Sequence, residues 1–518
     1  MKNSEELRQQ LRSINRKSYP AYKGLKSLYH FGNYILSIDH VQGDPFASPS
    51  HVSIQISHKD AGFPVEYYKD TLTGTTLCDY LTRQFEKQVS QYSFRAKGSG
   101  KSGLLTVSHC GQEILSRTAC EITEKGITAR FFVGFPANGR TINATELEKI
   151  LFDFLPVCIQ KSFFYSSLNA KELQNYIELA EDQEFIRQTL PAKNLCAFIA
   201  DGSILPRESG ISSRPMKASV PFTSPDSLRI SINLPHKGKI TGMGIPKGIT
   251  LIVGGGYHGK STLLNALELG VYNHIPGDGR EYVITDATAV KLRSEDGRFI
   301  KDVDISMFIN DLPNKKDTRC FSTLDASGST SQAAGIVESM EAGSHLFLLD
   351  EDTSATNFMV RDAFMQQVIQ REKEPITPFL ERAEDLYKKA GISTILVAGS
   401  SGAFFHIADT IIQMDNYVPK DITASVKKLC CQYPLPSVSV TDFQLPHSHR
   451  IMSRPAESSK RLRHNSRGNH SDSDATRPER LKTRISGTDS FSLGKQKIDL
   501  RYTEQLIDTE QTAALERV

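Results

Sequence analysis

The chain has 518 residues, of which 39% are hydrophobic and 23% are charged, and its formal net charge is +3. The length predicts about three structural units, and so small a net charge gives the whole chain no electrostatic preference for a partner. The composition is typical of a globular protein, and no apolar run approaches the roughly 20 residues that cross a bilayer.

The cysteines and the first residues of the chain indicate the cellular compartment in which the protein works. The eight cysteines include no C-x-x-C pair, which argues against a zinc site or a disulfide framework and favours reduced thiols. Residues 1–6 have early acids and no apolar stretch, which argues against a targeting signal. We therefore expect a cytoplasmic protein with no membrane domain on this chain.

Residues 1–226 are predicted to form an α+β domain. Alternating apolar and polar residues predict strands over 34–38, 52–56, 104–108 and 127–133. Helical spacing predicts helices over 77–89, 144–155 and 170–188. The stretch 202–226 is rich in glycine, serine and proline and is predicted to be a surface connection.

A glycine-rich turn in this domain resembles half of a phosphate-binding loop. Residues 98–103 read Gly-Ser-Gly-Lys-Ser-Gly, but Arg95 stands where a full motif needs glycine. A second nucleotide site is therefore not expected here. Lysine and arginine neighbours leave two interpretations open, a clasp for a phosphodiester and a solvated basic turn.

The second predicted domain, residues 227–445, contains a complete phosphate-binding motif after an apolar strand over 250–253 and before a helix. Glycines let backbone N–H groups turn inward around a phosphate, and the helix N-terminus attracts the same anion. We expect Lys260 to reach the β- and γ-phosphates and Ser261 to hold Mg²⁺. The predicted nucleotide-binding residues are Gly254, Gly255, Gly256, Tyr257, His258, Gly259, Lys260, Ser261 and Thr262.

A second anion-binding segment lies further along this domain, where strands and helices alternate as in a mostly parallel sheet covered by helices. Residues 322–332 carry several hydroxyl side chains and one glycine before a helix predicted to run through 333–342. Ser327, Gly328 and Ser329 are the candidates at its tip. An ordinary N-cap is the alternative, although it would explain only one or two of these residues.

Two later strands end in candidate catalytic residues. The strand predicted over 346–349 leads into Asp350, a candidate Mg²⁺ ligand, and Glu351, which could polarise an attacking water. Acids that merely cap a buried strand are the alternative. The strand predicted over 394–398 leads into Ser400, in a turn where a γ-phosphate sensor could lie; a plain turn is the alternative.

The end of the chain changes character. Residues 446–490 are rich in serine, arginine and histidine and are predicted to be disordered. Two interpretations of their basic side chains stay open, a solvated linker and a segment with non-specific affinity for phosphates. The segment 491–518 is predicted to be helical, with Leu500, Leu506, Ala514 and Leu515 on the apolar face of a helix over 498–518.

The order of these motifs resembles that of the ATP-binding-cassette superfamily. The residues within the motifs are similar to those of the soluble family of predicted ATPases of the ABC class. The resemblance covers most of residues 20–420 and about the last twenty. It is carried by residues 40–46, 135–140, 254–261, 274–281, 326–334 and 350–359.

The resemblance implies a P-loop fold, bound ATP and Mg²⁺, and a homodimer that sandwiches two nucleotides. Ser327, Gly328 and Ser329 would then contact the γ-phosphate held by the other subunit, and Asp352, Ser354 and Asn357 would form the turn between the sites. One member of the family is associated with mitochondrial RNA editing in kinetoplastids, which makes RNA a candidate ligand by analogy.

The sequence departs from the wider superfamily in several places. The signature is Ser-Gly-Ser-Thr-Ser-Gln, Ser400 replaces the switch histidine, and Asp304 to Ser306 stand where a glutamine loop is expected. No aromatic residue lies between Phe222 and Tyr257 to stack on adenine. These differences bear on base selectivity and turnover.

The resulting hypothesis is an ATPase in which Glu351, Lys260, Ser327, Gly328, Ser329 and Ser400 are catalytic and Ser261 and Asp350 hold the metal. Closure of the dimer would move the N-terminal domains, with RNA or DNA as a candidate partner. Two alternatives stay open: an ATP-gated switch with little turnover, and a P-loop kinase acting on a small molecule.

Overall fold

The structure is a computed structural model that describes residues 1–361, 368, 373–433, 443–446, 450, 483–494 and 496–517. Contacts between Cα atoms divide the chain into two compact units. The first comprises Met1–Pro246, Thr262–Ala287 and Asp415–Lys420, and the second comprises Lys247–Ser261, Thr288–Met414 and Asp421–Val518.

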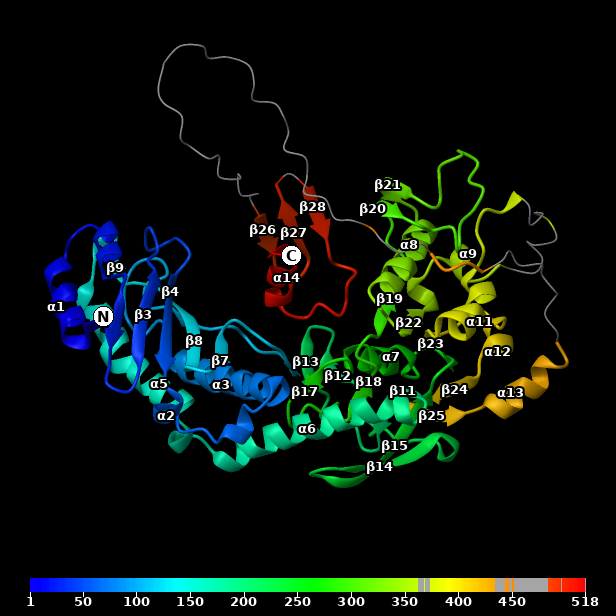
Figure 1. The fold of residues 1–518 in the computed structure, drawn as a ribbon, viewed down its shortest axis with the longest axis horizontal. Helices are drawn as coiled ribbons and strands as arrows, with labels where there is room; N and C mark the ends of the chain where they lie inside the picture. Colours follow the sequence, from blue (N-terminus) through cyan, green and yellow to red (C-terminus); the bar gives the residue numbers. More distant parts are fainter. Residues whose placement is uncertain are drawn as a thin grey trace, which may run out of the picture. The chain divides into compact units, whose positions relative to one another are not determined.

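A mainly antiparallel sheet forms the N-terminal part of the first unit (Figure 1), with the order β1-β2-β3-β4-β8-β5 and β7 paired to β8. Along β8, Ile127, Ala129, Phe131 and Val133 are buried while the residues between them are more exposed, so the two-residue period turns one face of the sheet to the core. The strands are β1 (Lys2–Asn3), β2 (Leu28–His30), β3 (Ile35–His40), β4 (Ser50–Ile56), β5 (Leu105–Thr106), β7 (Cys120–Thr123) and β8 (Gly126–Val133).

Helices cover this sheet and begin at well-formed caps. The Asp70 side chain accepts a hydrogen bond from Thr73 N at the start of α3, and Asn3 caps α1 in the same way. The helices are α1 (Ser4–Ile14), α2 (His58–Ala61), α3 (Thr71–Tyr92), α4 (Ala144–Glu148), α5 (Leu155–Phe163) and α6 (Ala170–Ala192), with a π-helical turn over Lys149–Phe154. Short pairs are made by β9 (Ala137–Asn138) with β10 (Thr141–Ile142) and by β6 (Glu113–Ile114) with β17 (Asn273–His274).

A second sheet of the first unit has the order β14-β15-β11-β18. Helix α6 shares its core, because Ile186 and Leu190 pack with Phe198, Ile232 and Ile284. The strands are β11 (Leu195–Ala200), β14 (Arg229–Leu234), β15 (Gly238–Pro246) and β18 (Val283–Thr285), and β12 (Arg207–Ser209) and β13 (Ser212–Pro215) form a hairpin.

A six-stranded sheet has the order β19-β22-β23-β16-β24-β25, and its strands β19, β22, β23 and β16 lie wholly in the second unit. The pairings from β19 through β24 are parallel, and every residue of β22 and β23 is buried, as expected for a parallel sheet covered on both faces. The strands are β16 (Ile249–Val253), β19 (Val290–Leu292), β22 (Leu346–Asp350), β23 (Ser393–Val397), β24 (Thr410–Asp415) and β25 (Val418–Asp421). The helices of the second unit are α8 (Gly328–Glu341), α9 (Thr356–Met359), α11 (Phe379–Ala390), α12 (Phe404–Ile407) and α13 (Thr423–Cys430), while α7 (Lys260–Leu269) begins in this unit and continues from Thr262 in the first.

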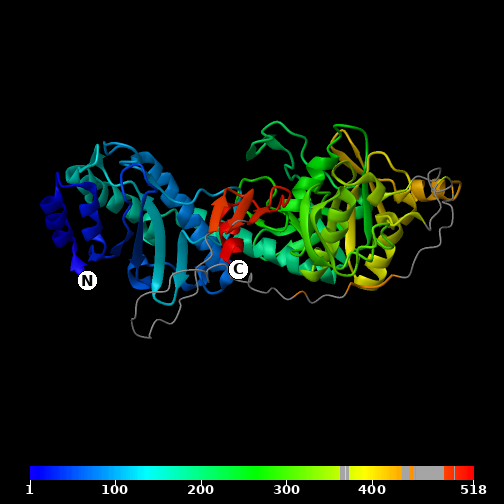
Figure 2. The ribbon, with the colours of Figure 1, turned by 90° about the horizontal axis from the view of Figure 1, so that it is seen from above.

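Two smaller antiparallel sheets complete the second unit. The first is a ribbon of β20 (Arg298–Val303) and β21 (Phe321–Ala326), which leads into α8. The second joins β26 (Thr483–Ser486), β27 (Ser490–Leu493) and β28 (Gln496–Asp499), and α14 (Thr509–Arg517) packs on it, as the red group in Figure 2 shows.

The predicted fold class, a mostly parallel α/β sheet preceded by an α+β part, is confirmed. The strands predicted over 34–38, 52–56, 127–133, 250–253, 346–349 and 394–398 and the helices predicted over 77–89, 170–188 and 333–342 are present with small shifts of their ends. The helix predicted over 144–155 is interrupted by the π-helical turn, and the strand predicted over 104–108 is reduced to β5.

Three predictions about segments need correction or lie outside the described residues. The predicted connection 202–226 contains the β12–β13 hairpin. The helix predicted over 498–518 is wrong in its first part, because residues up to Asp499 pair as β28 with β27 and only α14 is helical. Disorder predicted over 446–490 is wrong for β26 and the start of β27, and residues 447–449 and 451–482 lie outside the described residues.

Candidate functional site

The candidate residues follow three neighbouring parallel strands of the second unit. Strand β16 leads into residues 254–259 and α7, β22 ends at Asp350, and β23, which lies between them, leads into residues 398–402. Because parallel strands have their carboxyl ends at the same edge of a sheet, these three segments share one edge, where α/β proteins bind their ligands.

The carbonyl groups of the loop after β16 bind the lysine at its end, Lys260. Gly254 has φ +143°, and a Cβ atom there would lie 2.4 Å from the Met414 carbonyl oxygen, so the position requires glycine. Lys260 Nζ donates to the carbonyl oxygens of Gly254, at 2.8 Å, and Gly255, at 2.9 Å. The ammonium group is therefore held inside the loop that the sequence predicts as a phosphate cradle.

Tyr257 is the exposed tip of this loop. Its φ is +63° and its side chain is 98% exposed. Tyrosine rarely adopts a left-handed backbone conformation, whereas the loop's glycines do so without strain. Strain of this kind is found at functional sites more often than elsewhere.

Glu351 is fixed by the turn after β23. Its carboxylate accepts hydrogen bonds from Gly399 N at 2.7 Å, Ser400 N at 2.9 Å, Ser400 Oγ at 2.6 Å and Ser401 N at 3.1 Å. Burial alone would raise the pKa of Glu351, but these hydrogen bonds hold it below its ordinary value. The structure thus brings together Glu351 and Ser400 around an ionised carboxylate.

Asp350 is buried at the end of β22, where its carboxylate accepts a hydrogen bond from Asp352 N at 3.1 Å. Burial raises the pKa of Asp350, and the positive charges of Lys291 and Lys260 oppose this shift. Ser261, in the first turn of α7, is exposed. A carboxylate and a serine hydroxyl are hard oxygen donors, so this pair suits Mg²⁺, which takes its remaining ligands from water or phosphate oxygens.

The hydroxyl side chains at the tip of α8 form hydrogen bonds mainly with one another. Ser327 Oγ lies 3.4 Å from Ser329 Oγ and 2.9 Å from Thr330 Oγ1. Ser327 occupies the N-cap position of α8, yet its side chain makes no capping hydrogen bond. Capping therefore does not account for these hydroxyl groups.

Gln332 and Lys291 were not predicted from the sequence as site residues. Gln332 Nε2 donates to Ser354 Oγ at 2.9 Å, and Gln332 Oε1 accepts from Ala355 N at 3.0 Å. These bonds fasten α8 to the turn that follows Asp350 and Glu351. Gln332 closes the signature segment, which is a sequence signal that could have found it; Lys291 offers no such signal.

The glycine-rich turn 98–103 in the first unit has few amide groups left for a ligand. Ser99 N donates to Ala137 O at 2.8 Å, Lys101 N to Pro45 O at 2.7 Å and Gly103 N to Gly134 O at 2.9 Å. The structure therefore disfavours the phosphodiester clasp that the sequence left open.

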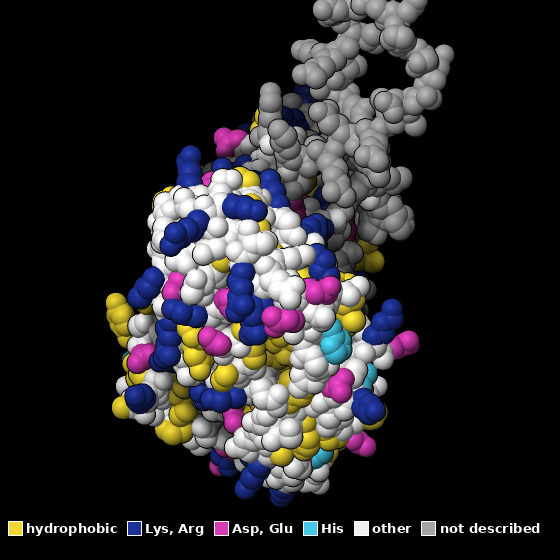
Figure 3. Space-filling view, turned by 90° about the vertical axis from the view of Figure 1, so that its left-hand side faces the viewer, with side chains coloured by type: hydrophobic (Ala, Val, Ile, Leu, Met, Phe, Trp, Pro, Cys, Tyr) yellow, Lys and Arg dark blue, Asp and Glu magenta, His cyan; other side chains and the backbone are white. Residues whose placement is uncertain are grey.

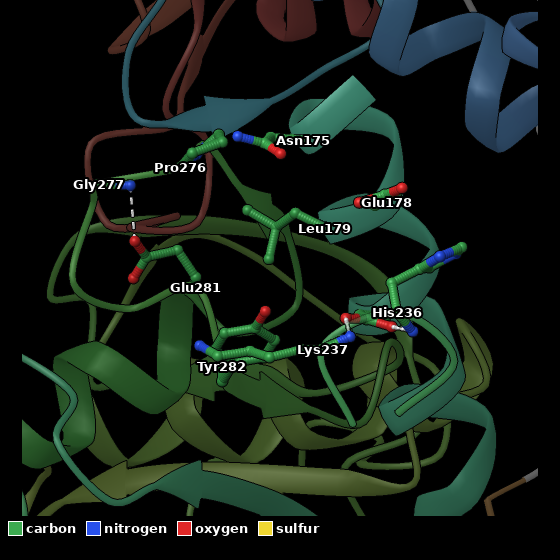
Figure 4. Close-up of a pocket in the computed structure, with 10 residues that line it drawn as sticks. Asn175, Glu178, Leu179, His236, Lys237, Pro276, Gly277, Glu281 and Tyr282 are labelled. Atoms are coloured by element: carbon green, nitrogen blue, oxygen red, sulfur yellow. Dashed lines mark hydrogen bonds between the residues drawn. The ribbon is translucent and has the colours of Figure 1, made fainter. Parts of the chain in front are cut away.

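The first unit also contains a hollow of about 400 Å³ that none of the predicted site residues lines (Figure 4). Lys237 Nζ lies 4.1 Å from the centre of the Tyr282 ring. The buried Asp182 carboxylate accepts from the backbone N–H groups of His236 and Lys237, each at 3.0 Å. These polar groups have partners within the protein, so they give no indication of a particular ligand.

Among the described residues, the face that Figure 3 draws carries side chains of both charge signs. In Figure 3, lysine and arginine side chains are interspersed with acidic ones. A surface of mixed charge gives no electrostatic argument for nucleic acid binding there.

Family models match most of the chain. A model described as an ABC_ATPase P-loop domain matches residues 169–448, and one described as the N-terminal part of ATPases of the ABC class matches residues 4–166. In the part of the chain that the structure describes, no helix is both long enough and apolar enough to cross a membrane.

The chain is similar in sequence to a protein of an archaeon and in structure to ATP-binding cassettes of transporters. The uncharacterized protein MJ1628 of Methanocaldococcus jannaschii is 31% identical over 251 residues, which cover 46% of this chain and 54% of that protein. The chain thus spans about half the length of this relative. The ADP conformation of MJ1267, an ATP-binding cassette of an ABC transporter, is 13% identical with a TM-score of 0.25, over 38% of this chain and 88% of its own. An inward-facing putative metal-chelate type ABC transporter is 19% identical with a TM-score of 0.26, over 40% and 90%.

Proposed function

The chain belongs to the ABC_ATPase family of P-loop proteins, and from this premise we propose that it binds ATP with Mg²⁺ and hydrolyses it between two copies of itself. The observation that carries the proposal is the clamp on Glu351, whose carboxylate accepts four hydrogen bonds from the turn after β23. An ionised carboxylate is thereby fixed at the sheet edge that also carries the loop 254–259.

Nucleotide binding follows from the loop after β16. The Lys260 ammonium, which now donates to Gly254 and Gly255, exchanges these carbonyl oxygens for the β- and γ-phosphate oxygens, while loop amides bind the same phosphates. Ser261 and Asp350 would hold Mg²⁺, which would supply positive charge beside the transferred phosphoryl group.

Hydrolysis requires a water in line with the γ-phosphate. Glu351 orients this water by accepting a hydrogen bond from it in exchange for one of the backbone N–H groups that it now binds. Its depressed pKa keeps the carboxylate ionised at neutral pH. Ser400 stays hydrogen-bonded to Glu351, so a movement of Glu351 on nucleotide binding or hydrolysis also moves the turn after β23. Here a serine does the work that a histidine does in the wider superfamily.

The second copy supplies what one chain lacks. The hydroxyl groups of Ser327 and Ser329 are not used to cap α8, and together with the Gly328 amide they form a set of donors suited to a phosphate. We place them on the γ-phosphate held by the partner. The Gln332–Ser354 bond then links this contact to the turn beside Glu351.

The experiment replaces Glu351 with glutamine. We expect ATP hydrolysis to fall by roughly 10²–10⁴-fold, the usual contribution of a positioned base, and the variant to accumulate as an ATP-bound dimer in light scattering. Glu384→Gln, which alters an exposed surface ion pair with Lys388, is the matched control. Hydrolysis by Glu351→Gln at the wild-type rate would refute the role assigned to Glu351.

The same measurements separate the other candidate functions. The replacement of the switch histidine by Ser400 favours an ATP-gated switch with little turnover, which predicts phosphate release near background in the wild-type chain but retains ATP-driven dimerisation. A small-molecule kinase predicts ATP binding without dimerisation.

We propose that closure acts on nucleic acid and that the protein works in the cytoplasm. Support for the first point comes from the basic residues of the segment 451–482 rather than from the mixed-charge face in Figure 3. Support for the second comes from the eight cysteines, all of them free thiols, which suit a reducing compartment.

A further inference from the structure

Residues near the C-terminus pair with the edge strand of the sheet that carries the site. The Gln505 side chain does this with both ends of its amide: Oε1 accepts from Lys291 N at 3.1 Å, and Nε2 donates to Ala289 O at 3.0 Å. One side chain thus makes the two hydrogen bonds that a neighbouring strand would make to β19. These C-terminal residues lie outside both family models, which end at residues 166 and 448.

Glu504, beside Gln505, pairs with two cations of the same strand region. Its carboxylate accepts from Lys291 Nζ and, at 2.5 Å, from Arg293 Nη1. The Arg293 guanidinium also lies 4.8 Å from the centre of the Tyr502 ring. The Lys291 side chain is only 7% exposed, so its charge depends on protein partners rather than on water.

Lys291 lies within reach of Asp350. Strands β19 and β22 are parallel, with Lys291 opposite Leu348, so Asp350 is two residues further along on the same face of the sheet. Strand spacing and rise place the two Cα atoms about 8 Å apart, a separation that an extended lysine side chain spans. The Lys291 charge also lowers the pKa of Asp350 against the larger, opposite effect of burial.

We propose that Glu504 is a positioning residue for the nucleotide site: it holds the Lys291 ammonium away from Asp350, so that the Asp350 carboxylate stays available to the metal–nucleotide complex. Without Glu504, the buried ammonium turns to the carboxylate of Asp350 on the same face of the sheet and competes with the cation. The C-terminal segment thereby becomes part of the ATP site. This inference rests on the proposed function.

The test is a double-mutant cycle with Glu504→Ala, Lys291→Met and the combined variant. Calorimetry measures the binding of ATP with Mg²⁺ and, separately, of ATP with a chelator. We expect Glu504→Ala to weaken ATP binding with Mg²⁺ by about tenfold, in the range that one charge-assisted hydrogen bond controls, and to leave metal-free binding unchanged. The combined variant should recover to within about twofold of wild type, because the competing cation is gone.

The controls distinguish positioning from folding. Glu504→Gln keeps the shape of the side chain but not its charge, so it should behave like Glu504→Ala, while Glu516→Ala removes a carboxylate from the same C-terminal segment and should bind like wild type. An unchanged Mg²⁺ dependence in Glu504→Ala, or a defect that Lys291→Met does not rescue, would overturn the inference. A wild-type chain that binds no ATP with Mg²⁺ would instead overturn the proposed function.

Discussion

At the scale of single residues, Tyr257 shows a conflict between stability and the needs of the loop. A non-glycine residue in the left-handed region costs roughly 1–2 kcal/mol, and Tyr257 recovers nothing by packing because it is 98% exposed. A glycine at this position would be free of that strain, so the tyrosine side chain is retained against stability. This pattern is typical of residues that meet a ligand or a partner.

We predict that Tyr257→Gly stabilises the protein. Relief of the strain exceeds the extra chain entropy of glycine, which is about 0.5–1 kcal/mol, so the free energy of unfolding should rise by about 0.5–1 kcal/mol. Urea denaturation followed by circular dichroism would measure it. Tyr433→Gly is the control, because Tyr433 is also exposed, at 73%, but is not among the residues with positive φ. A loss of stability in Tyr257→Gly comparable to that of the control would contradict the strain argument.

At the scale of elements, buried charges fasten the far end of α7 within the first unit. His274 Nε2 lies 3.1 Å from Leu269 O at the end of the helix, and its Nδ1 lies 2.9 Å from Asp278 Oδ2. Arg207 Nη2 donates to the same Asp278 oxygen at 2.8 Å. This end of α7 is therefore fixed by side chains remote from the loop in sequence.

We predict that Asp278→Asn is strongly destabilising. The Asp278 side chain is fully buried, and its replacement leaves the Arg207 guanidinium without its counter-ion, which typically costs about 3–5 kcal/mol. Urea denaturation would measure the loss. Asp226→Asn, which breaks an ion pair with Arg229 at a carboxylate that is 91% exposed, should change little. Equal effects of the two substitutions would show that the buried cluster is dispensable.

The elements that the sequence predicts well are those defined by local patterns. The apolar strand over 250–253 and the glycine motif after it determine β16 and the loop through nearest neighbours alone. The helix over 498–518 failed because Gln496–Asp499 pairs with β27, and such pairing overrides a weak helical spacing. Lys291 and Glu504 are 213 residues apart, so no local pattern could have joined them.

At the scale of the whole molecule, the residues that we propose for the nucleotide site fall into two groups. Lys260, Asp350 and Glu351 lie at the sheet edge, while Ser327 and Ser329 form hydrogen bonds with each other at the tip of α8. The family resemblance predicted this division from motif order alone. The dimer and the roles of these residues stay predictions until the Glu351→Gln chain is tested.

We predict that the segment 451–482 binds nucleic acid. It contains eight lysine and arginine residues and four acidic ones, so it is the basic part of a chain whose net charge is only +3. Each cation that meets a phosphate of single-stranded RNA contributes about −0.7 to the slope of log K against log salt. If most of the eight do so, the slope should approach about −5.

The experiment compares RNA binding by the full chain and by a chain in which 451–482 is replaced by a glycine–serine linker of equal length. Fluorescence anisotropy across a salt series should show that the replacement weakens binding at low salt and flattens the slope. ATP hydrolysis without RNA should stay unchanged, because residues 483–517 can still reach β19. Equal affinity and equal slope in the two chains would place any RNA site elsewhere. A weaker but equally steep dependence would mean that other cations of the chain make the phosphate contacts.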